Sequence, residues 1–231
     1  RTIDSLDRAI IAGKAPNSFN TGAVLKATSD VVQKRERTAN VVAFLEGNDP
    51  LLKDEYLVIG GHYDHLGFGG PGSGSRMPDT IAVHNGADDN ASGTAMVMAL
   101  AARLAPEKGN LKRSIIFVAF SSEEIGLLGS KYFVDHPPVP LKQIKTMFNF
   151  DMVGRFDKEK NSISVSGTGT SLEADSILKI AEGKLSFAVV HAPDGYGPSD
   201  HAMFYSSNIP VFYFNTGVHT DYHTPFDDVD R

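Results

Sequence analysis

Two adjacent carboxylates, Asp88 and Asp89, stand between glycines in the segment GADDNASG, directly before the apolar stretch from Thr94 to Leu104. Glycine lets the backbone turn tightly and approach other groups closely. Two unpaired acids buried in such a turn are costly unless a cation lies against them. The segment therefore predicts a metal site. The alternative is a solvated acidic turn in which Asn90 or Ser92 caps the following helix.

A second cluster of chemical side chains, His-Tyr-Asp-His at residues 62–65, follows an apolar segment that is typical of a buried strand. In extended chain His62 and Asp64 point the same way. A histidine that binds a metal usually donates its other ring N–H to an oxygen acceptor such as a carboxylate, so His62 is predicted to be a ligand and Asp64 the acid that orients it. His65 points to the other face and is interpreted as a structural or rim histidine, with a ligand role as the minor alternative.

The segments that must position these side chains alternate between strand and helix patterns. Strands are predicted over residues 38–45, 56–60, 114–120, 146–150, 162–166, 187–190 and 210–215, and helices near 3–10, 92–105, 126–134, 171–183 and after 201. The nearly all-apolar segment 114–120 is typical of a central strand covered on both faces. The order predicts one α/β domain with a mostly parallel, mixed central sheet of about six to eight strands and helices on both faces.

Acids and histidines follow the predicted strands at the points where each strand ends. Glu123 and Glu124 follow segment 114–120, Asp151 follows 146–150, and His223 follows the last strand. Ligand sites in open α/β sheets lie at the carboxyl ends of the strands. Several carboxylates gathered there repel unless cations join them. Together with His62 and Asp89, this set suits two zinc-like ions bridged by one carboxylate and one water; a single metal or none is the alternative.

Composition limits the other classes of function. The 231 residues, 41% of them hydrophobic, suit a globular domain with a sizeable core. A net charge of −6 gives no basic field for nucleic acid, and no apolar run reaches the roughly 20 residues of a membrane span. The absence of cysteine leaves His, Asp and Glu as the strong metal ligands. The oligomeric state cannot be read from the sequence.

Six motifs occur in a fixed order: GGHYDHLG, NGADDNASGTA, SSEEIGLLGS, NFDMVGR, PSDHAMF and YHTPFDD. As an ordered set they resemble the co-catalytic di-zinc aminopeptidase family, whose relatives include glutamate carboxypeptidase, the transferrin receptor ectodomain and glutaminyl cyclase. The resemblance runs from about Thr38 to the end of the chain. It implies a three-layer α/β/α sandwich, two Zn²⁺ ions per chain, and an aminopeptidase that hydrolyses N-terminal residues from peptides with a water bridging the two zinc ions.

The resemblance also implies roles for the residues that match the motifs. One zinc is expected on His62, Asp89 and Asp151, and the other on Asp89, Glu124 and His223, so that Asp89 is the bridge. A cis peptide bond is expected between Asp89 and Asn90.

Glu123 matches the family's general base. Tyr222 is either a hydroxyl that supports the tetrahedral oxyanion or a packed ring. Asp200 resembles an acid that lies behind the ligands. Arg155 either meets a substrate carboxylate or balances acidic charge, and charge balance is favoured.

Residues 38–231 are expected to form the catalytic domain, with residues 1–37 as an N-terminal segment packing on it. The helix that family members carry after the HTP motif is expected to be absent, because the chain stops at Arg231. Family analogy predicts a periplasmic or extracellular protein, although no signal peptide is present in this chain. The glycine-rich segment 67–79 is a candidate lid, with a plain surface loop as the alternative.

The expected partners are peptides with a free N-terminus. Met152, Phe204 and Tyr205 are predicted to favour apolar first residues. The rival functions within the superfamily are a single-zinc glutaminyl cyclase-like acyltransferase and a carboxypeptidase.

Overall fold

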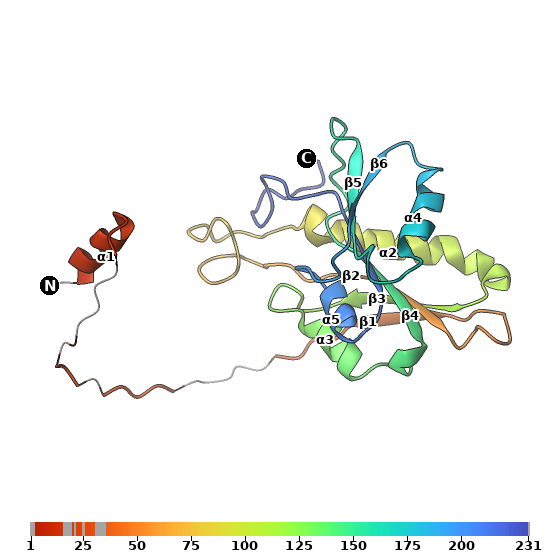
Figure 1. Cartoon of the computed structure of the whole chain (residues 1–231), viewed down its shortest axis with the longest axis horizontal. Coiled ribbons are helices and arrows are strands. Elements are labelled where there is room, and N and C mark those ends of the chain that lie inside the picture. Colours follow the sequence, from red (N-terminus) through yellow and green to blue (C-terminus); the bar gives the residue numbers. More distant parts are fainter. Residues whose placement is uncertain (1–2, 16–19, 21, 25, 31–35, 231) are drawn as a thin grey trace. The chain divides into compact units, whose positions relative to one another are not determined.

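The computed structural model describes residues 3–15, 20, 22–24, 26–30 and 36–230, and it divides the chain into two units, Arg1–Glu36 and Arg37–Arg231. The smaller unit contains helix α1 (Ile3–Ile11), which matches the predicted N-terminal helix (Figure 1). Part of segment 17–37 lies outside the described residues, and the described residues there form no strand. The expected packing of this segment on the core stays a prediction.

The larger unit is built on one seven-stranded sheet in the order β1-β3-β2-β4-β7-β5-β6. Neighbours among β3, β2, β4 and β7 run parallel, as do β5 and β6, whereas β1 is antiparallel to β3 and β5 is antiparallel to β7. The predicted mostly parallel, mixed sheet is therefore confirmed. The strands are β1 (Val41–Leu45), β2 (Tyr56–His62), β3 (Ser114–Phe120), β4 (Ile144–Phe150), β5 (Ser162–Ser166), β6 (Ala188–Ala192) and β7 (Val211–Asn215).

Among the described residues of this unit, four α-helices and three short helical turns connect the strands. The helices are α2 (Gly93–Leu104), α3 (Leu128–Asp135), α4 (Ala174–Glu182) and α5 (His201–Ser206), and the turns are η1 (Ala87–Ser92), η2 (Ala105–Asn110) and η3 (Leu141–Gln143). Helix α3 begins two residues later than predicted, because Gly126 and Leu127 both have positive φ angles of 110° and 59° that a right-handed helix cannot contain. The first strand begins at Val41 rather than Thr38.

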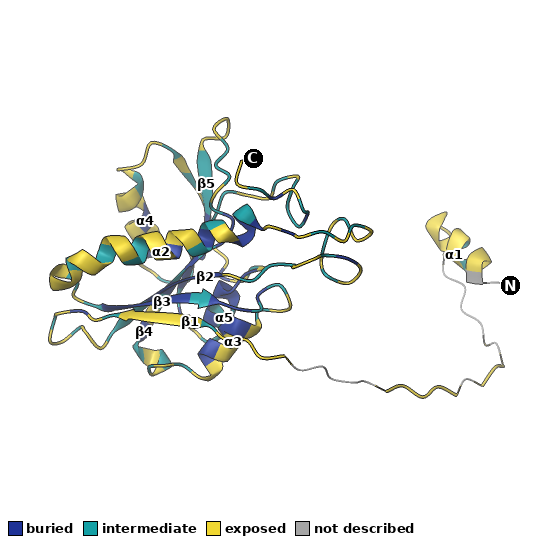
Figure 2. Ribbon diagram, turned by 180° about the vertical axis from the view of Figure 1, so that it is seen from behind, coloured by how far each residue is buried: buried dark blue, intermediate teal, exposed yellow. Residues whose placement is uncertain are grey.

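Side chains of the central strands alternate between two apolar clusters. In β3, Ile116, Val118 and Phe120 pack with residues of α3 and α5, whereas Ile115 and Phe117 pack with residues of α2. This alternation follows from the two-residue period of a strand, and it requires helices on both faces. A third cluster joins β5 and β7 to α4. The outer side of α2 is largely exposed (Figure 2), so the unit has the three-layer α/β/α arrangement.

None of the helices in the described part of the chain is both long enough and apolar enough to cross a membrane.

Phe204 of α5 is fully buried between Phe120 and Phe133, with ring centroids 5.9 and 5.4 Å away. We predict that Phe204→Ala lowers the free energy of unfolding by about 3–5 kcal/mol, because the cavity it leaves cannot be filled by rigid neighbours. The matched control is Phe68→Ala at a ring that is 69% exposed, which should cost no more than about 0.5 kcal/mol. Urea unfolding of both variants checks this, and equal losses would contradict the assignment of α5 to the core.

Candidate metal centre

Three parallel strands bring acidic and imidazole groups to one edge of the sheet. β2 ends at His62, whose register partner in β3 is Phe120, and β3 leads directly into the segment with Glu123 and Glu124. β4 runs parallel to β2 on its other side and leads into Asp151. The convergence expected from the strand pattern is present in the structure.

The turn η1 carries Asp89 into the space between these strand ends. Gly93 allows the close approach, because a Cβ there would lie 2.1 Å from the carbonyl oxygen of Phe150. The Asn90 side chain ties the turn to the end of β4: its amide donates to Phe150 O at 3.0 Å, and its oxygen accepts the N–H of Met152 at 3.2 Å. The peptide bond between Asp89 and Asn90 is cis, as the motif resemblance implied.

The two carboxylate oxygens of Asp89 face two different histidines. Oδ1 lies 3.3 Å from Nε2 of His62, and Oδ2 lies 3.1 Å from Nε2 of His223. His62 Nε2 is also 3.4 Å from Asp151 Oδ1, and His223 Nε2 is 3.2 Å from Glu124 Oε2. The donor atoms therefore form two groups that share one carboxylate.

The distances between donor atoms fit the size of a zinc ion. Donor atoms of His62, Glu123 and Asp151 lie within 4.8 Å of one another, as do those of His65, Asp89 and Glu124. Two ligand atoms on one tetrahedral zinc ion with bonds of about 2.0–2.1 Å are separated by about 3.3 Å. The 3.1–3.4 Å separations around His62 and His223 match this value, and an all-nitrogen-and-oxygen donor set suits zinc.

The charge balance of the cluster calls for a cation. Burial, reinforced by Asp151 and opposed by His62, raises the pKa of the Glu123 carboxyl to about 9. Burial works against charge on His223, yet hydrogen bonds with Asp89 and Glu124 outweigh it and raise the pKa of its imidazole to about 10. The pKa of His62 is also raised, by Asp151 and Asp89 against the effect of burial. Without a cation, protons on the histidines and on Glu123 must compensate the carboxylates.

Asp64 lies in the site but differs in its contacts from the prediction. His62 Nδ1 donates to the backbone carbonyl of Asp64 at 3.0 Å, whereas the Asp64 carboxylate is 3.8 Å away. That carboxylate accepts the backbone N–H groups of Glu123 at 3.0 Å and Glu124 at 3.3 Å. The backbone carbonyl of Asp64, rather than its carboxylate, therefore orients His62. Asp64 thus fixes the backbone of the glutamate pair.

His65, interpreted from the sequence as a structural or rim histidine on the other face, lies inside the site. Its Nδ1 is 2.6 Å from Glu124 Oε1, and its side chain is 9% exposed. The alternation rule that placed it on the opposite face does not apply beyond the end of β2. Its position next to Asp64 in a histidine-rich segment was the available signal.

Arg155 balances acidic charge, as the sequence analysis favoured. Its guanidinium donates to Asp221 Oδ2 at 2.7 Å and to Asp227 Oδ1 at 2.8 Å. The other oxygen of Asp227 accepts the backbone N–H groups of Asp88 and Asp89, each at 3.0 Å. Asp227 is fully buried and sits in the YHTPFDD motif, but nothing in its spacing indicated this role. Arg155 and Asp227 together fix the turn that carries Asp89.

Two loops complete the surroundings of His223. In the glycine-rich segment, Gly74 O lies 3.1 Å from His223 Nδ1, and the N–H of Arg76 donates to His223 O at 2.9 Å. The ring of Tyr222 stacks on His223 with centroids 3.8 Å apart. Burial raises the pKa of the Tyr222 hydroxyl, helped by Asp89 and Glu124, so the group is neutral and keeps its proton. Segment 67–79 therefore orients His223, and its role as a lid stays a prediction.

Asp200 is fully buried behind the cluster. Burial, with help from the charge of Asp151, raises the pKa of its carboxyl to about 7. The nearby hydroxyl of Ser130 donates to the carbonyl oxygen of Leu127 at 3.2 Å.

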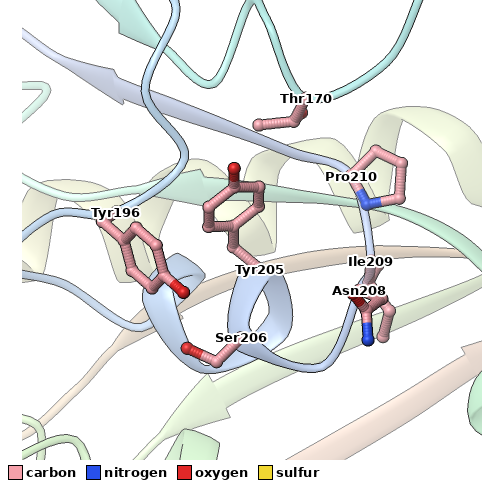
Figure 3. A pocket seen from close by; sticks show the side chains of 7 residues that line it. All are labelled: Thr170, Tyr196, Tyr205, Ser206, Asn208, Ile209 and Pro210. Carbon is pink, nitrogen blue, oxygen red and sulfur yellow. The ribbon is translucent and has the colours of Figure 1, made fainter.

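A small cavity of about 80 Å³ opens onto the donor atoms. Its apolar wall is formed by Met152, Pro198 and Val218, together with the rings of Tyr213 and Tyr222. The predicted contributions of Phe204 and Tyr205 are wrong. Phe204 is fully buried in the core, and Tyr205 lines a different pocket of about 290 Å³ with Thr170, Tyr196, Ser206, Asn208, Ile209 and Pro210 (Figure 3).

The model of peptidase family M28 matches residues 40–231 of this chain. The chain belongs to peptidase family M28. The family predicted from the ordered motifs is therefore confirmed, and the M28 match covers the whole metal centre and every strand of the sheet.

Individual relatives are aminopeptidases. The chain is 33% identical over 161 residues to aminopeptidase YwaD of Bacillus subtilis, covering 66% of this chain and 35% of the relative. It is 28% identical over 218 residues to leucine aminopeptidase 2 of Arthroderma otae, covering 89% of this chain and 39% of the relative. The chain thus spans well under half the length of these curated relatives.

A solved structure shows the same fold. The zinc aminopeptidase BSAP of Bacillus subtilis superposes with a TM-score of 0.65 at 30% identity, over 83% of this chain and 44% of that one. The three-layer zinc-aminopeptidase fold expected from the motifs is confirmed.

We predict that Arg155→Gln lowers the free energy of unfolding by about 3 kcal/mol, because it leaves the buried carboxylate of Asp227 without its cation. The matched control is Arg103→Gln, whose partner Glu107 is exposed, and its loss should stay below about 1 kcal/mol. Urea unfolding measures both. Equal losses would show that Arg155 does not support the Asp89 turn.

Proposed function

We propose that this chain is the catalytic part of a metal-dependent aminopeptidase that holds two zinc ions. The observation that carries the proposal is the division of the Asp89 carboxylate between His62 and His223. In this proposal His62 and Asp151 complete one site, Glu124 and His223 complete the other, and Asp89 belongs to both. Bound zinc would polarise the scissile carbonyl and lower the pKa of a water shared by the two ions.

Glu123 is the proposed general base. It borders the cavity, and the 4.0 Å between its Oε2 and His62 Nε2 is longer than the 3.1–3.4 Å contacts among the proposed ligands. A nearby cation lowers the pKa of a carboxyl group, which moves Glu123 from about 9 toward the neutral range that proton transfer needs. The carboxylate then takes the proton of the attacking water and delivers it to the leaving amine.

Tyr222 is the proposed donor to the oxyanion that forms on the scissile carbonyl. Its ring borders the cavity, and its raised pKa keeps the hydroxyl protonated. A neutral donor in a buried site stabilises developing negative charge without carrying charge itself.

The cavity favours one apolar side chain next to a free α-amino group. Glu123 and Asp151 supply anionic partners for an ammonium group, whereas Met152, Val218 and Pro198 supply apolar surface. The small volume suits the first residue of a peptide better than a long internal segment. The name of the leucine aminopeptidase relative supports the same preference.

The rival functions fit the cavity less well. A carboxypeptidase needs a cation for the substrate carboxylate, but no Lys or Arg is among the described residues that line the cavity, and Arg155 is engaged by two aspartates. A single-zinc acyltransferase does not need the second donor group of Asp89, Glu124 and His223. We also propose, from family analogy, a periplasmic or extracellular location.

We predict hydrolysis of leucyl-p-nitroanilide and no hydrolysis of its N-acetyl derivative, because acetylation removes the charge that Glu123 and Asp151 recognise. Release of nitroaniline by the zinc-loaded chain measures both. A Glu123→Gln preparation purified in parallel controls for contaminating peptidases. Comparable rates on the two substrates would contradict the aminopeptidase proposal.

The two adjacent glutamates should respond differently to substitution. We predict that Glu123→Gln keeps both zinc ions and loses on the order of 10²- to 10⁴-fold in kcat, since it removes only the proton acceptor. Glu124→Ala should instead lose or weaken one zinc ion. Zinc content by elemental analysis, paired with kcat, checks both variants. Loss of metal from Glu123→Gln with retention in Glu124→Ala would reverse the proposed roles.

A further inference from the structure

His65 contacts one oxygen of Glu124 while His223 contacts the other. Nδ1 of His65 is 2.6 Å from Oε1, and Nε2 of His223 is 3.2 Å from Oε2. Each oxygen of this carboxylate therefore has its own imidazole. An ionised carboxylate can only accept hydrogen bonds, so the short contact to His65 requires a hydrogen on Nδ1.

The distances separate a hydrogen bond from shared metal binding. Two atoms bound to one tetrahedral zinc ion lie about 3.3 Å apart. The 3.2 Å between His223 and Glu124 fits that separation, whereas 2.6 Å between His65 and Glu124 is shorter and is typical of a charge-assisted hydrogen bond. His65 Nδ1 also stays 3.9 Å from Asp89 Oδ2. The geometry thus distinguishes His65 from His223.

The surroundings hold the His65 ring in this position. Gly86 has a φ of 62°, and a Cβ there would lie 2.7 Å from the His65 ring, so only glycine leaves room for the imidazole. The ring lies edge-on to His223, with centroids 5.8 Å apart. The preceding residue, Asp64, holds the backbone N–H groups of Glu123 and Glu124. Asp64 therefore holds the backbone of both glutamates, and the next residue, His65, holds the side chain of Glu124.

We propose that His65 is a positioning residue that donates to Glu124 Oε1 and so leaves only Oε2 for the metal shared with His223. The inference rests on the proposed function, because it assumes that Glu124 is a ligand. Adjacent glutamates have the same side chain, and Asp64 fixes the backbone of both. The hydrogen bond from His65 is what restricts the carboxylate of Glu124 and leaves that of Glu123 free to accept a proton.

The test compares His65→Asn with His65→Leu. The two new side chains have nearly the same shape, but asparagine keeps an N–H donor at the position of Nδ1, whereas leucine has none. Zinc affinity is measured by competition with a chromophoric chelator on the folded chain. His136→Leu, which removes an exposed histidine near the end of α3, is the matched control.

We expect one of the two zinc ions to bind on the order of 10- to 100-fold more weakly in His65→Leu, which is the usual loss when a group that orients a ligand is removed. His65→Asn should stay within about threefold of the unmodified chain, as should His136→Leu. Equal weakening by Asn and Leu would overturn the proposal, because it would mean that His65 binds the metal or only packs. Normal zinc affinity in His65→Leu would also overturn it.

Two further measurements keep the test decisive. If His65→Leu does not fold, as judged by circular dichroism of the metal-free chain, His65→Ala serves as the donor-free variant and must show the same loss. Hydrolysis of leucyl-p-nitroanilide is recorded separately. If the chain binds two zinc ions with the expected dependence on His65 but hydrolyses nothing, only the proposed function is refuted. If the enzyme is active and His65→Leu binds zinc as tightly as the unmodified chain, only the role of His65 is refuted.

Discussion

Mutual repulsion among buried carboxylates is the constraint on which the rest of the structure depends. Asp89, Glu123, Glu124 and Asp151 converge on one small cavity, where water cannot screen them well. Burial, reinforced by Asp151, raises the pKa of Glu123, and contacts with the carboxylates raise the pKa values of His62 and His223. Cations resolve the same problem without protons, so the arrangement that destabilises the metal-free site is the arrangement that creates affinity for metal.

The fold meets this constraint mainly through backbone hydrogen bonds. Asp64 accepts the N–H groups of the glutamate pair, Asp227 accepts those of the Asp89 turn, and Arg155 neutralises Asp227. Asp64 and Asp227 each hold the backbone of a segment that carries donor side chains, and Arg155 supports Asp227. The positions of the donor atoms are therefore set by a rigid frame before any ligand binds, which is the usual condition for a precise metal site.

The sequence predicted the sheet and most of the site because both depend on short-range pattern. Strand ends are readable from apolar runs, and parallel strands must deliver their following residues to one edge, so His62 and Asp151 could be placed together without coordinates. The pattern failed where the chain leaves regular structure. The two-residue period of β2 was applied beyond the end of that strand at His62, so His65 was placed on the wrong face.

Several residues that line the cavity could not be predicted, because they come from segments that are distant in the sequence. Phe204 ends the PSDHAMF motif and Tyr205 follows it, but α5 places Phe204 in the core and Tyr205 in a separate pocket. Val218 and Pro198 instead line the cavity, and no spacing rule identifies such residues. The role of Asp227 depended on a contact across 138 residues, which local pattern does not encode.

That last contact has a consequence for how the protein matures. The turn with Asp89 is held by Asp227, which follows Asp89 by 138 residues, and the proposed ligands extend from His62 to His223. Contacts of such long sequence separation form late, because the entropy of closing the intervening chain must first be overcome. During synthesis from the N-terminus, the acidic strand ends are made well before their clamp exists. The turn that carries Asp89 is therefore fixed only after the segment with Asp227 has been made and has docked against it.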